Sequence, residues 1–169
     1  MPVVIEPVRP EHLPEIAALA DVIWHSHYPG IISPAQIDYM LARMYPVDVM
    51  RLELEDNIEW LRVLLNSSLR GFTSFGPTGA AKEFKLHKLY IHPDSHRQGL
   101  GTALLQEVET RAGNCGAAAL TLNVNKRNAK AIAAYHRRGF TIRESIVADI
   151  GGGFVVDDFI MAKPLPPTP

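Results

Sequence analysis

The hydrophobic pattern in the N-terminal third of the chain is mostly helical. A short β-branched run at residues 3–8 predicts an edge strand, because it contains a charged residue and a proline. Apolar residues then recur every three or four positions over residues 13–24, which predicts a helix, and the Pro-Gly pair within residues 25–30 predicts a loop after it. A second helix with Ser33 as its N-cap and a shorter helix after Pro46 are expected next.

The pattern changes to strands in the middle of the chain and then alternates between helices and strands. Three strands joined by short turns predict an antiparallel meander. These strands are expected at residues 59–65, 69–75 and 81–92. Further helices are expected at 101–112 and 128–138, and further strands at 118–124, 140–147 and 154–161.

These elements together predict a mixed α/β fold. Its core would be a mostly antiparallel sheet of about seven strands with helices on both faces. We expect a single domain over residues 1–163, followed by a frayed, proline-rich tail at residues 164–169.

Composition narrows the possible partners and the cellular compartment. The 169 residues carry a formal net charge of −1, so no excess of positive charge indicates nucleic acid or an anionic membrane as a partner. The single cysteine, Cys115, excludes an intramolecular disulfide and a cysteine-based zinc site. We find no pattern of a signal peptide or a membrane span and therefore expect a cytoplasmic protein.

The strand at residues 81–92 changes the phase of its apolar positions. Phe84 and Leu86 are even-numbered, whereas Leu89 and Ile91 are odd-numbered. A strand with one buried face alternates strictly, so a slip of one position predicts a β-bulge near His87. Burial of both faces of the strand would explain the same pattern without a bulge, and both readings stay open.

A glycine-containing loop links this strand to the following helix. Backbone N–H groups around a helix N-terminus can bind phosphate, and glycines let the ligand approach the backbone closely. A dinucleotide-binding fingerprint would need a third glycine where Leu104 stands, and the Gly-Lys-Ser/Thr run of a nucleotide-binding P-loop is absent. Both of those phosphate loops are therefore excluded.

A second motif begins where the next strand ends. Asn128 and Tyr135 are two helical turns apart and share one face of the predicted helix. From the residues alone, Asn128 is explained as an N-cap and Tyr135 as a core residue, and Gly139 as the end of the helix.

These motifs, in this order and spacing, resemble the GNAT superfamily of N-acetyltransferases, loosely its polyamine-acetylating branch. The resemblance rests on residues 86–93, 96–101 and 128–135 and on the Gly139-Phe140 pair. It implies acetyl-coenzyme A as the co-substrate, without a metal, and a primary amine of a small molecule as the acceptor. A direct attack of the neutral amine on the thioester, in a ternary complex, is the implied reaction.

The resemblance also implies which residues bind the coenzyme. A strand-like contact with the pantetheine arm, a backbone cradle for the pyrophosphate and two side chains on the later helix are expected. The residues are Leu89, Tyr90, Ile91, His96, Arg97, Gln98, Gly99, Leu100, Gly101, Thr102, Asn128 and Tyr135. His96 departs from the glutamine or arginine usual at the first position of the cradle motif.

Candidate catalytic groups follow from the proton balance of the reaction. An alkylamine with a pKa near ~10 is mostly protonated at neutral pH, so a group or a water relay must accept its proton. Glu83 and His87 on the predicted strand are the candidate bases, with the pair His25 and His27 as the alternative. Tyr135 is the candidate donor to the departing thiolate. Cys115 lies in a predicted turn and is not expected to act as a nucleophile.

The acceptor side is the least defined. Trp24, His25 and Tyr28 are expected to line the acceptor site, and Asp157 to attract a cationic amine. A peptide or protein N-terminus as the acceptor, a non-catalytic acyl-CoA sensor and a plain interaction domain remain as alternatives. A homodimer is compatible with the first two of these and with the enzyme.

Overall fold

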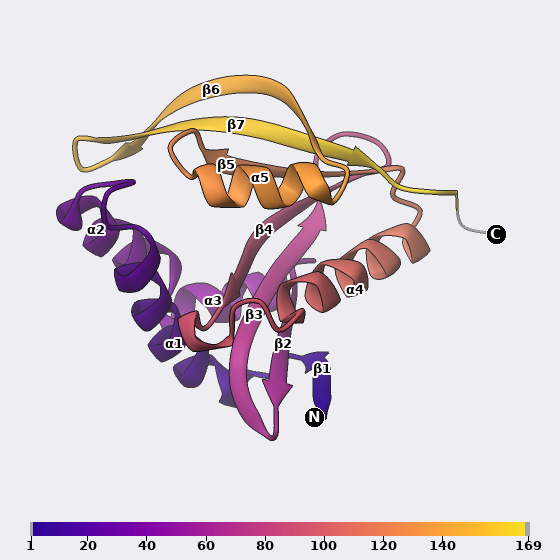
Figure 1. Cartoon of the computed structure of the whole chain (residues 1–169), viewed down its shortest axis with the longest axis horizontal. Helices are drawn as coiled ribbons and strands as arrows, with labels where there is room; N and C mark the ends of the chain where they lie inside the picture. Colours follow the sequence, from indigo (N-terminus) through magenta and orange to yellow (C-terminus); the bar gives the residue numbers. More distant parts are fainter. Residues whose placement is uncertain (1, 168–169) are drawn as a thin grey trace. The chain divides into compact units, whose positions relative to one another are not determined.

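The structure is a computed structural model that describes residues 2–167 (Figure 1). The chain divides into two compact units, one made of Met1–Gly76 and His87–Val108 and the other of Pro77–Leu86 and Glu109–Pro169. Within residues 2–167, seven strands form a mixed sheet in the order β1-β2-β3-β4-β5-β7-β6. Strand β4 (Glu83–Ile91) runs from the second unit into the first. The predicted mixed α/β fold is confirmed, whereas the single domain stays a prediction.

The first unit contains the first two strands of the expected meander, preceded in the sheet by the expected edge strand. Strands β1 (Val3–Pro7), β2 (Glu59–Leu65) and β3 (Ser68–Pro77) pair antiparallel in this order. Asn66 and Ser67 connect β2 to β3 with φ angles of 51° and 66°. Two successive left-handed residues are the geometry of a tight hairpin turn, which explains why asparagine stands at its start.

Three α-helices lie entirely within the described part of the first unit. They are α1 (Leu13–His27), α2 (Pro34–Met44) and α3 (Val47–Glu55). Ser33 caps α2 as expected, because its hydroxyl oxygen accepts the N–H of Gln36 at 3.1 Å. The expected start of a loop at His25 is wrong: α1 continues through His27. It ends only before Pro29, whose missing N–H cannot continue the helix.

The core of the first unit lies between these helices and the strands. Leu13, Ile16 and Met50 from the helices and Phe72 from β3 have no solvent exposure. Burying an aliphatic side chain of this size stabilises the fold by about 1.5–3 kcal/mol. The helical spacing of the N-terminal apolar residues is therefore explained by this core.

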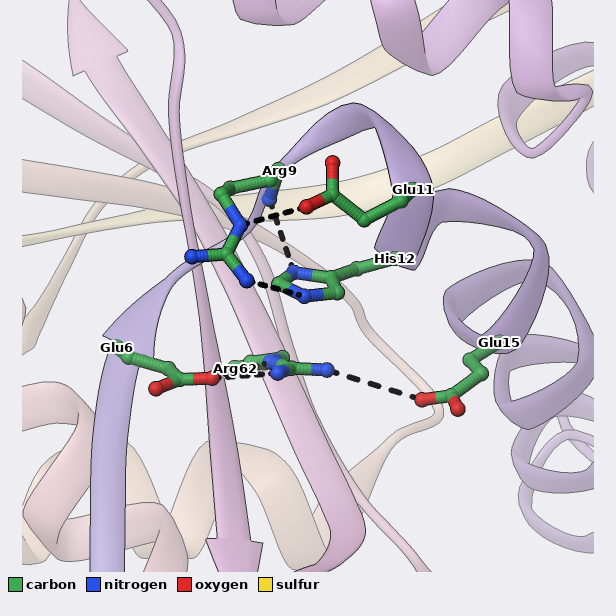
Figure 2. A network of polar contacts seen from close by, with 6 residues as sticks. All are labelled: Glu6, Arg9, Glu11, His12, Glu15 and Arg62. Carbon is green, nitrogen blue, oxygen red and sulfur yellow. Dashed lines mark hydrogen bonds and ion pairs between the residues drawn. The ribbon is translucent and has the colours of Figure 1, made fainter.

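A polar network fixes the start of α1 beside β1 and β2 (Figure 2). The Arg62 guanidinium donates to the Glu6 carboxylate at 2.5 and 2.9 Å and lies 3.8 Å from that of Glu15. The hydrogen bond from Arg62 lowers the pKa of Glu6. The Nδ1 atom of the buried His12 accepts the N–H of Arg9 at 3.0 Å, which anchors the turn before the helix.

The second unit is built around a long hairpin. Strand β5 (Ala119–Asn125) pairs parallel with residues 83–86 of β4 and antiparallel with β7 (Phe154–Pro164). Strand β6 (Thr141–Gly151) pairs antiparallel with β7, and the two form the orange and yellow hairpin of Figure 1. Helix α5 (Ala129–Arg137) links β5 to β6, and α4 (Leu100–Asn114) begins in the first unit and ends in the second.

The C-terminal segment is more ordered than expected. Pro164 is the last residue of β7, and the N–H of Leu165 donates to the carbonyl of Ala118 at 2.8 Å. The Leu165 side chain is buried. Fraying from residue 164 onward is therefore wrong for these two positions, and the end of the expected tail at residues 168–169 lies outside the described residues.

No helix within the described part of the chain has both the length and the apolar character that crossing a membrane requires.

Candidate functional site

The loop between β4 and α4 is braced by its own backbone. The N–H of His92 donates to the carbonyl of Arg70 on β3 at 2.7 Å. A short 3₁₀ turn, η2 (Pro93–Ser95), follows, in which the N–H of Ser95 donates to the His92 carbonyl at 2.9 Å. The His92 ring accepts the N–H of Asp94 at 3.0 Å. These hydrogen bonds hold the loop in one defined shape.

His96, the residue that departs from the family motif, also braces this loop. Its Nε2 atom lies 3.0 Å from the carbonyl oxygen of Ile91. Because a carbonyl only accepts, the imidazole must donate here, which places a proton on Nε2. The side chain at this position thus holds the end of β4 to the cradle loop, a contact that the sequence did not predict.

The cradle, which we define as residues 97–102 from the loop after β4 to the first turn of α4, has backbone geometry that is typical of an anion site. Arg97 and Gly99 have φ angles of 65° and 78°, and the Gly99 carbonyl accepts the N–H of Ala103 at 3.0 Å, so Gly99 precedes the first turn of α4. The first N–H groups of a helix have no carbonyl partner within it and carry the positive end of its dipole. A Cβ on Gly99 would meet no atom within 4 Å, so this position is open to a ligand. The backbone here therefore has features of an anion site, and its role toward the pyrophosphate stays a prediction.

A buried ion pair anchors β4 just before the predicted pantetheine contacts. Lys88 is 9% exposed, and its Nζ atom lies 3.8 Å from the Glu53 carboxylate on α3. The same ammonium lies over the rings of Trp60 and Tyr45, at 5.2 and 5.6 Å. Burial raises the pKa of Glu53, and the charge of Lys88 partly offsets that rise. The hydroxyl of Thr73 donates to the Lys88 carbonyl at 2.6 Å.

An aromatic cluster surrounds the predicted acceptor residues of the first unit. Trp24 is buried and lies 4.4 Å from the Tyr28 ring and 5.8 Å from the Tyr90 ring. Its indole N–H donates to the Tyr45 hydroxyl at 3.3 Å. Burial raises the pKa of Tyr45 well above its usual value. The structure thus brings Trp24, Tyr28 and Tyr90 together in one cluster, whereas a role of these side chains toward an acceptor stays a prediction.

His25 links two helices on the surface of the first unit. Its Nε2 atom lies 3.1 Å from the Asp38 carboxylate on α2, and its Nδ1 atom lies 2.9 Å from the Asp21 carbonyl. The hydrogen bond with the Asp21 backbone contributes most to raising the pKa of His25, and the hydrogen bond with the Asp38 carboxylate raises it further. The residue therefore holds α1 to α2 most strongly when it is protonated.

The candidate bases occupy different surroundings on β4. Glu83 forms an ion pair with Arg143 of β6 at 3.1 Å. His87 is exposed, between the buried Leu86 and Lys88. The ion pair of Glu83 and the exposure of His87 do not show which of the two is the base. The bulge expected near His87 also stays a prediction.

The second coenzyme motif is ordered as a helix start. Asn128 is buried, and its side-chain oxygen accepts the N–H of Ala131 at 3.4 Å, so its role as the N-cap of α5 is confirmed. Tyr135 lies on α5 with its ring 5.4 Å from that of Phe140. A role of either side chain toward the coenzyme stays a prediction.

Two adjacent carboxylates on β7 differ sharply. Asp157 forms an ion pair with Lys126 at 2.6 Å. The Asp158 carboxylate is half-buried and, among residues 2–167, has no hydrogen bond or direct ion pair. Burial raises its pKa, and the nearby charge of Asp157 raises it further. The positive charges of Lys85 and Lys126 partly offset this rise in the pKa. The sequence singled out Asp157, but the carboxylate without a direct ion pair among the described residues is that of Asp158.

The described residues contain no group of three or more histidine, cysteine, aspartate or glutamate side chains that could hold a metal ion.

Comparisons with known proteins show the family and the fold of the chain. The sequence model of the Acetyltransferase (GNAT) family matches residues 18–140. The crystal structure of a PaiA N-acetyltransferase from Thermoplasma acidophilum, in complex with coenzyme A, superposes with a TM-score of 0.81. It is 25% identical to this chain, and the match covers 97% of this chain and 99% of the other.

Two curated relatives match the chain in part. An L-methionine sulfoximine/L-methionine sulfone acetyltransferase of Salmonella typhimurium is 31% identical over 80 residues, 46% of this chain and 47% of that protein. A ribosomal protein bS18-alanine N-acetyltransferase of Escherichia coli K12 is 40% identical over 86 residues, 49% of this chain and 57% of that protein. The chain thus matches about half the length of these relatives.

Proposed function

Since this chain belongs to the GNAT family of acetyltransferases, we propose that it transfers the acetyl group of acetyl-CoA to a primary amine of a small molecule, such as a polyamine or an amino acid. It is an acetyl-CoA-dependent acyltransferase, and the proposal concerns the acceptor and the residues that act on it. The observation that carries it is the open cradle at Gly99, where a braced loop meets the start of α4.

Backbone groups of the first unit would hold the coenzyme. The first N–H groups of α4 and of the loop at residues 97–102 would bind the pyrophosphate, because the start of a helix presents backbone N–H groups at the positive end of its dipole. Residues 89–91 of β4 would hydrogen-bond the pantetheine arm as an added strand does. Acetyl-CoA supplies the activated acyl group as a thioester.

The side chains of this chain would move the protons of the reaction. Glu83 or His87, directly or through water, would accept the proton of the amine before it attacks. Tyr135 would donate to the departing thiolate, since a phenol and a thiol have reference pKa values of about 10 and about 8.5. A backbone N–H of β4 near His87 would stabilise the developing oxyanion.

A cationic small amine is favoured by the polar groups of the second unit. The half-buried carboxylate of Asp158 has no protein counter-ion within hydrogen-bonding distance among the described residues, and an ammonium group would compensate its charge. The two curated relatives act on a small amino acid analogue and on a protein alanine. Two alternatives therefore remain: an enzyme that acetylates the N-terminus of a peptide or protein, and an acyl-CoA sensor without turnover.

The test is acetyl-CoA-dependent thiol release with three probes: spermidine, L-methionine sulfone and a peptide with an N-terminal alanine. Release with one of the first two, at a kcat/KM at least about tenfold above that of the peptide, supports a small-amine acceptor. Release with the peptide alone supports the alternative. Acetyl-CoA binding without release from any probe favours the sensor.

Replacing Tyr135 by phenylalanine tests the role of its hydroxyl. We expect Tyr135→Phe to bind acetyl-CoA as the wild type does and to lose about 10²-fold or more in kcat, because a general acid contributes on that order. Tyr39→Phe is the matched control, since the Tyr39 hydroxyl accepts from Arg43 in an exposed contact within α2. Loss of acetyl-CoA binding together with kcat in Tyr135→Phe would contradict the assignment.

A further inference from the structure

The loop after α1 is organised around one residue, Tyr28. The N–H groups of Ile31 and Ile32 both donate to the Tyr28 carbonyl, at 2.8 and 3.2 Å. Gly30 lies in this turn with a φ angle of 86°, and a Cβ there would meet no atom within 4 Å. The loop is therefore a compact turn whose position depends on how Tyr28 is held.

The side chain of Tyr28 joins this loop to β4. Its hydroxyl oxygen lies 2.9 Å from the hydroxyl oxygen of Tyr90, a hydrogen bond in which either group is the donor. Its ring lies 4.4 Å from that of Trp24 and 5.0 Å from that of His27. Both tyrosines are half-buried.

Tyr90 is itself held from several directions. Its ring lies 5.7 Å from the Phe72 ring on β3 and 5.8 Å from the Trp24 ring on α1. Two residues earlier, Lys88 is fixed by Glu53 and by the bond from Thr73 to its carbonyl. Tyr90 thus presents its hydroxyl from a strand that has little freedom to shift.

Aromatic packing alone does not require these two hydroxyls, because phenylalanine rings would fill the same space. A phenol that is half-buried without a partner costs free energy, whereas a hydroxyl pair specifies one position of the loop. We infer that Tyr28 and Tyr90 form a latch that fixes the loop at residues 28–32 on β4, and that Tyr28 is a positioning residue for the amine acceptor. This inference rests on the proposed function, because it assigns the loop to the acceptor side of that site.

The kinetic test uses Tyr28→Phe and Tyr90→Phe with the best of the three amine probes named above. We expect each variant to raise the KM for the amine about three- to tenfold, the effect of losing one hydrogen bond. The dissociation constant for acetyl-CoA should stay within about twofold, because the coenzyme contacts on β4 are backbone groups. The double variant should be no worse than the more affected single variant, since both changes remove the same bond.

Tyr39→Phe is again the matched control, and it should leave the KM unchanged. A purely structural role would lower the melting temperature of the variants and leave the KM for the amine at the wild-type value. That result, in both single variants, would overturn the inference.

Hydrogen exchange tests the latch without an amine. The amides of Ile31 and Ile32 should exchange at least about threefold faster in Tyr28→Phe than in the wild type, because the loop opens locally. Unchanged exchange would overturn the latch. Failure of the wild type to bind acetyl-CoA would instead overturn the proposed function, and this exchange comparison would still decide whether the latch exists.

Discussion

At the scale of single residues, two neighbouring aspartates have different ionic contacts. Asp157 and Asp158 are indistinguishable in the sequence, yet among the described residues only the first forms a direct ion pair, with Lys126. Consecutive residues of a strand point to opposite faces, so Lys126 pairs with Asp157 and acts on the Asp158 carboxylate only as a nearby charge. A charge without a partner in a half-buried place is unfavourable for folding alone, which favours a role in binding.

The two carboxylates allow a matched test of acceptor charge. We expect Asp158→Asn to raise the KM for spermidine about tenfold, because the isosteric amide cannot compensate an ammonium group. Asp157→Asn should change that KM less than about twofold, since its carboxylate already pairs with Lys126. Equal effects of the two substitutions in thiol-release assays would contradict the preference for Asp158.

His25 gives a prediction for the dependence of stability on pH. Its pKa in the folded protein is raised, so protonation stabilises the contact between α1 and α2. This contribution is fully present below the unfolded pKa of about 6.5 and is lost as the pH rises through the folded pKa. Because the side chain is half exposed, we expect it to be worth only about 0.5 kcal/mol.

The comparison of melting temperatures at pH 5.5 and 8.5 checks this prediction. His25→Gln should lower the melting temperature by about 1–2 °C at the acidic pH and have little effect at the basic pH. A deficit that is larger at pH 8.5 would show that the sign is wrong.

At the scale of elements, substitutions at two glycines distinguish the effect of backbone strain from the effect of contact with the coenzyme. Gly99 and Gly116 have φ angles of 78° and 89°, and a Cβ on either would meet no atom within 4 Å. Gly99→Ala and Gly116→Ala should therefore cost similar stability, about 1 kcal/mol each. Only Gly99→Ala should weaken acetyl-CoA binding, by about tenfold or more in titration calorimetry. Equal affinities of the two variants would contradict the placement of the pyrophosphate.

Local features of the elements could be predicted from the sequence because their causes are local. The cap by Ser33 and the tight turn at Asn66 depend on residues within a few positions, and both are found. The end of α1 was placed too early because a Pro-Gly pair marks a break without saying how far the helix reaches toward it. The actual limit is the missing N–H of Pro29, so His25 remains helical.

Contacts between distant elements could not be predicted in the same way. Tyr28 and Tyr90 are 62 positions apart, and the pattern gave no reason to pair them. Lys88 faces the core of the first unit, where sequence periodicity favours an apolar residue, and its burial depends on Glu53 from another element. The coenzyme cradle was predicted because its strand, loop and helix are contiguous in the chain.

At the scale of the whole molecule, the division into two units bears on how the protein unfolds. Strand β4 and helix α4 each contribute residues to both units, so neither unit is a continuous piece of chain. We therefore expect one cooperative transition in calorimetry, with equal calorimetric and van't Hoff enthalpies, as the predicted single domain requires. Two resolved transitions would contradict that prediction.

Acetyl-CoA binding is the central claim, and titration calorimetry of the purified protein with acetyl-CoA tests it most directly. We predict saturable binding to one site per chain that is lost or strongly weakened in Gly99→Ala and retained in Gly116→Ala. No heat of binding to well-folded wild-type protein, or equal binding by both variants, would contradict the account of the cradle.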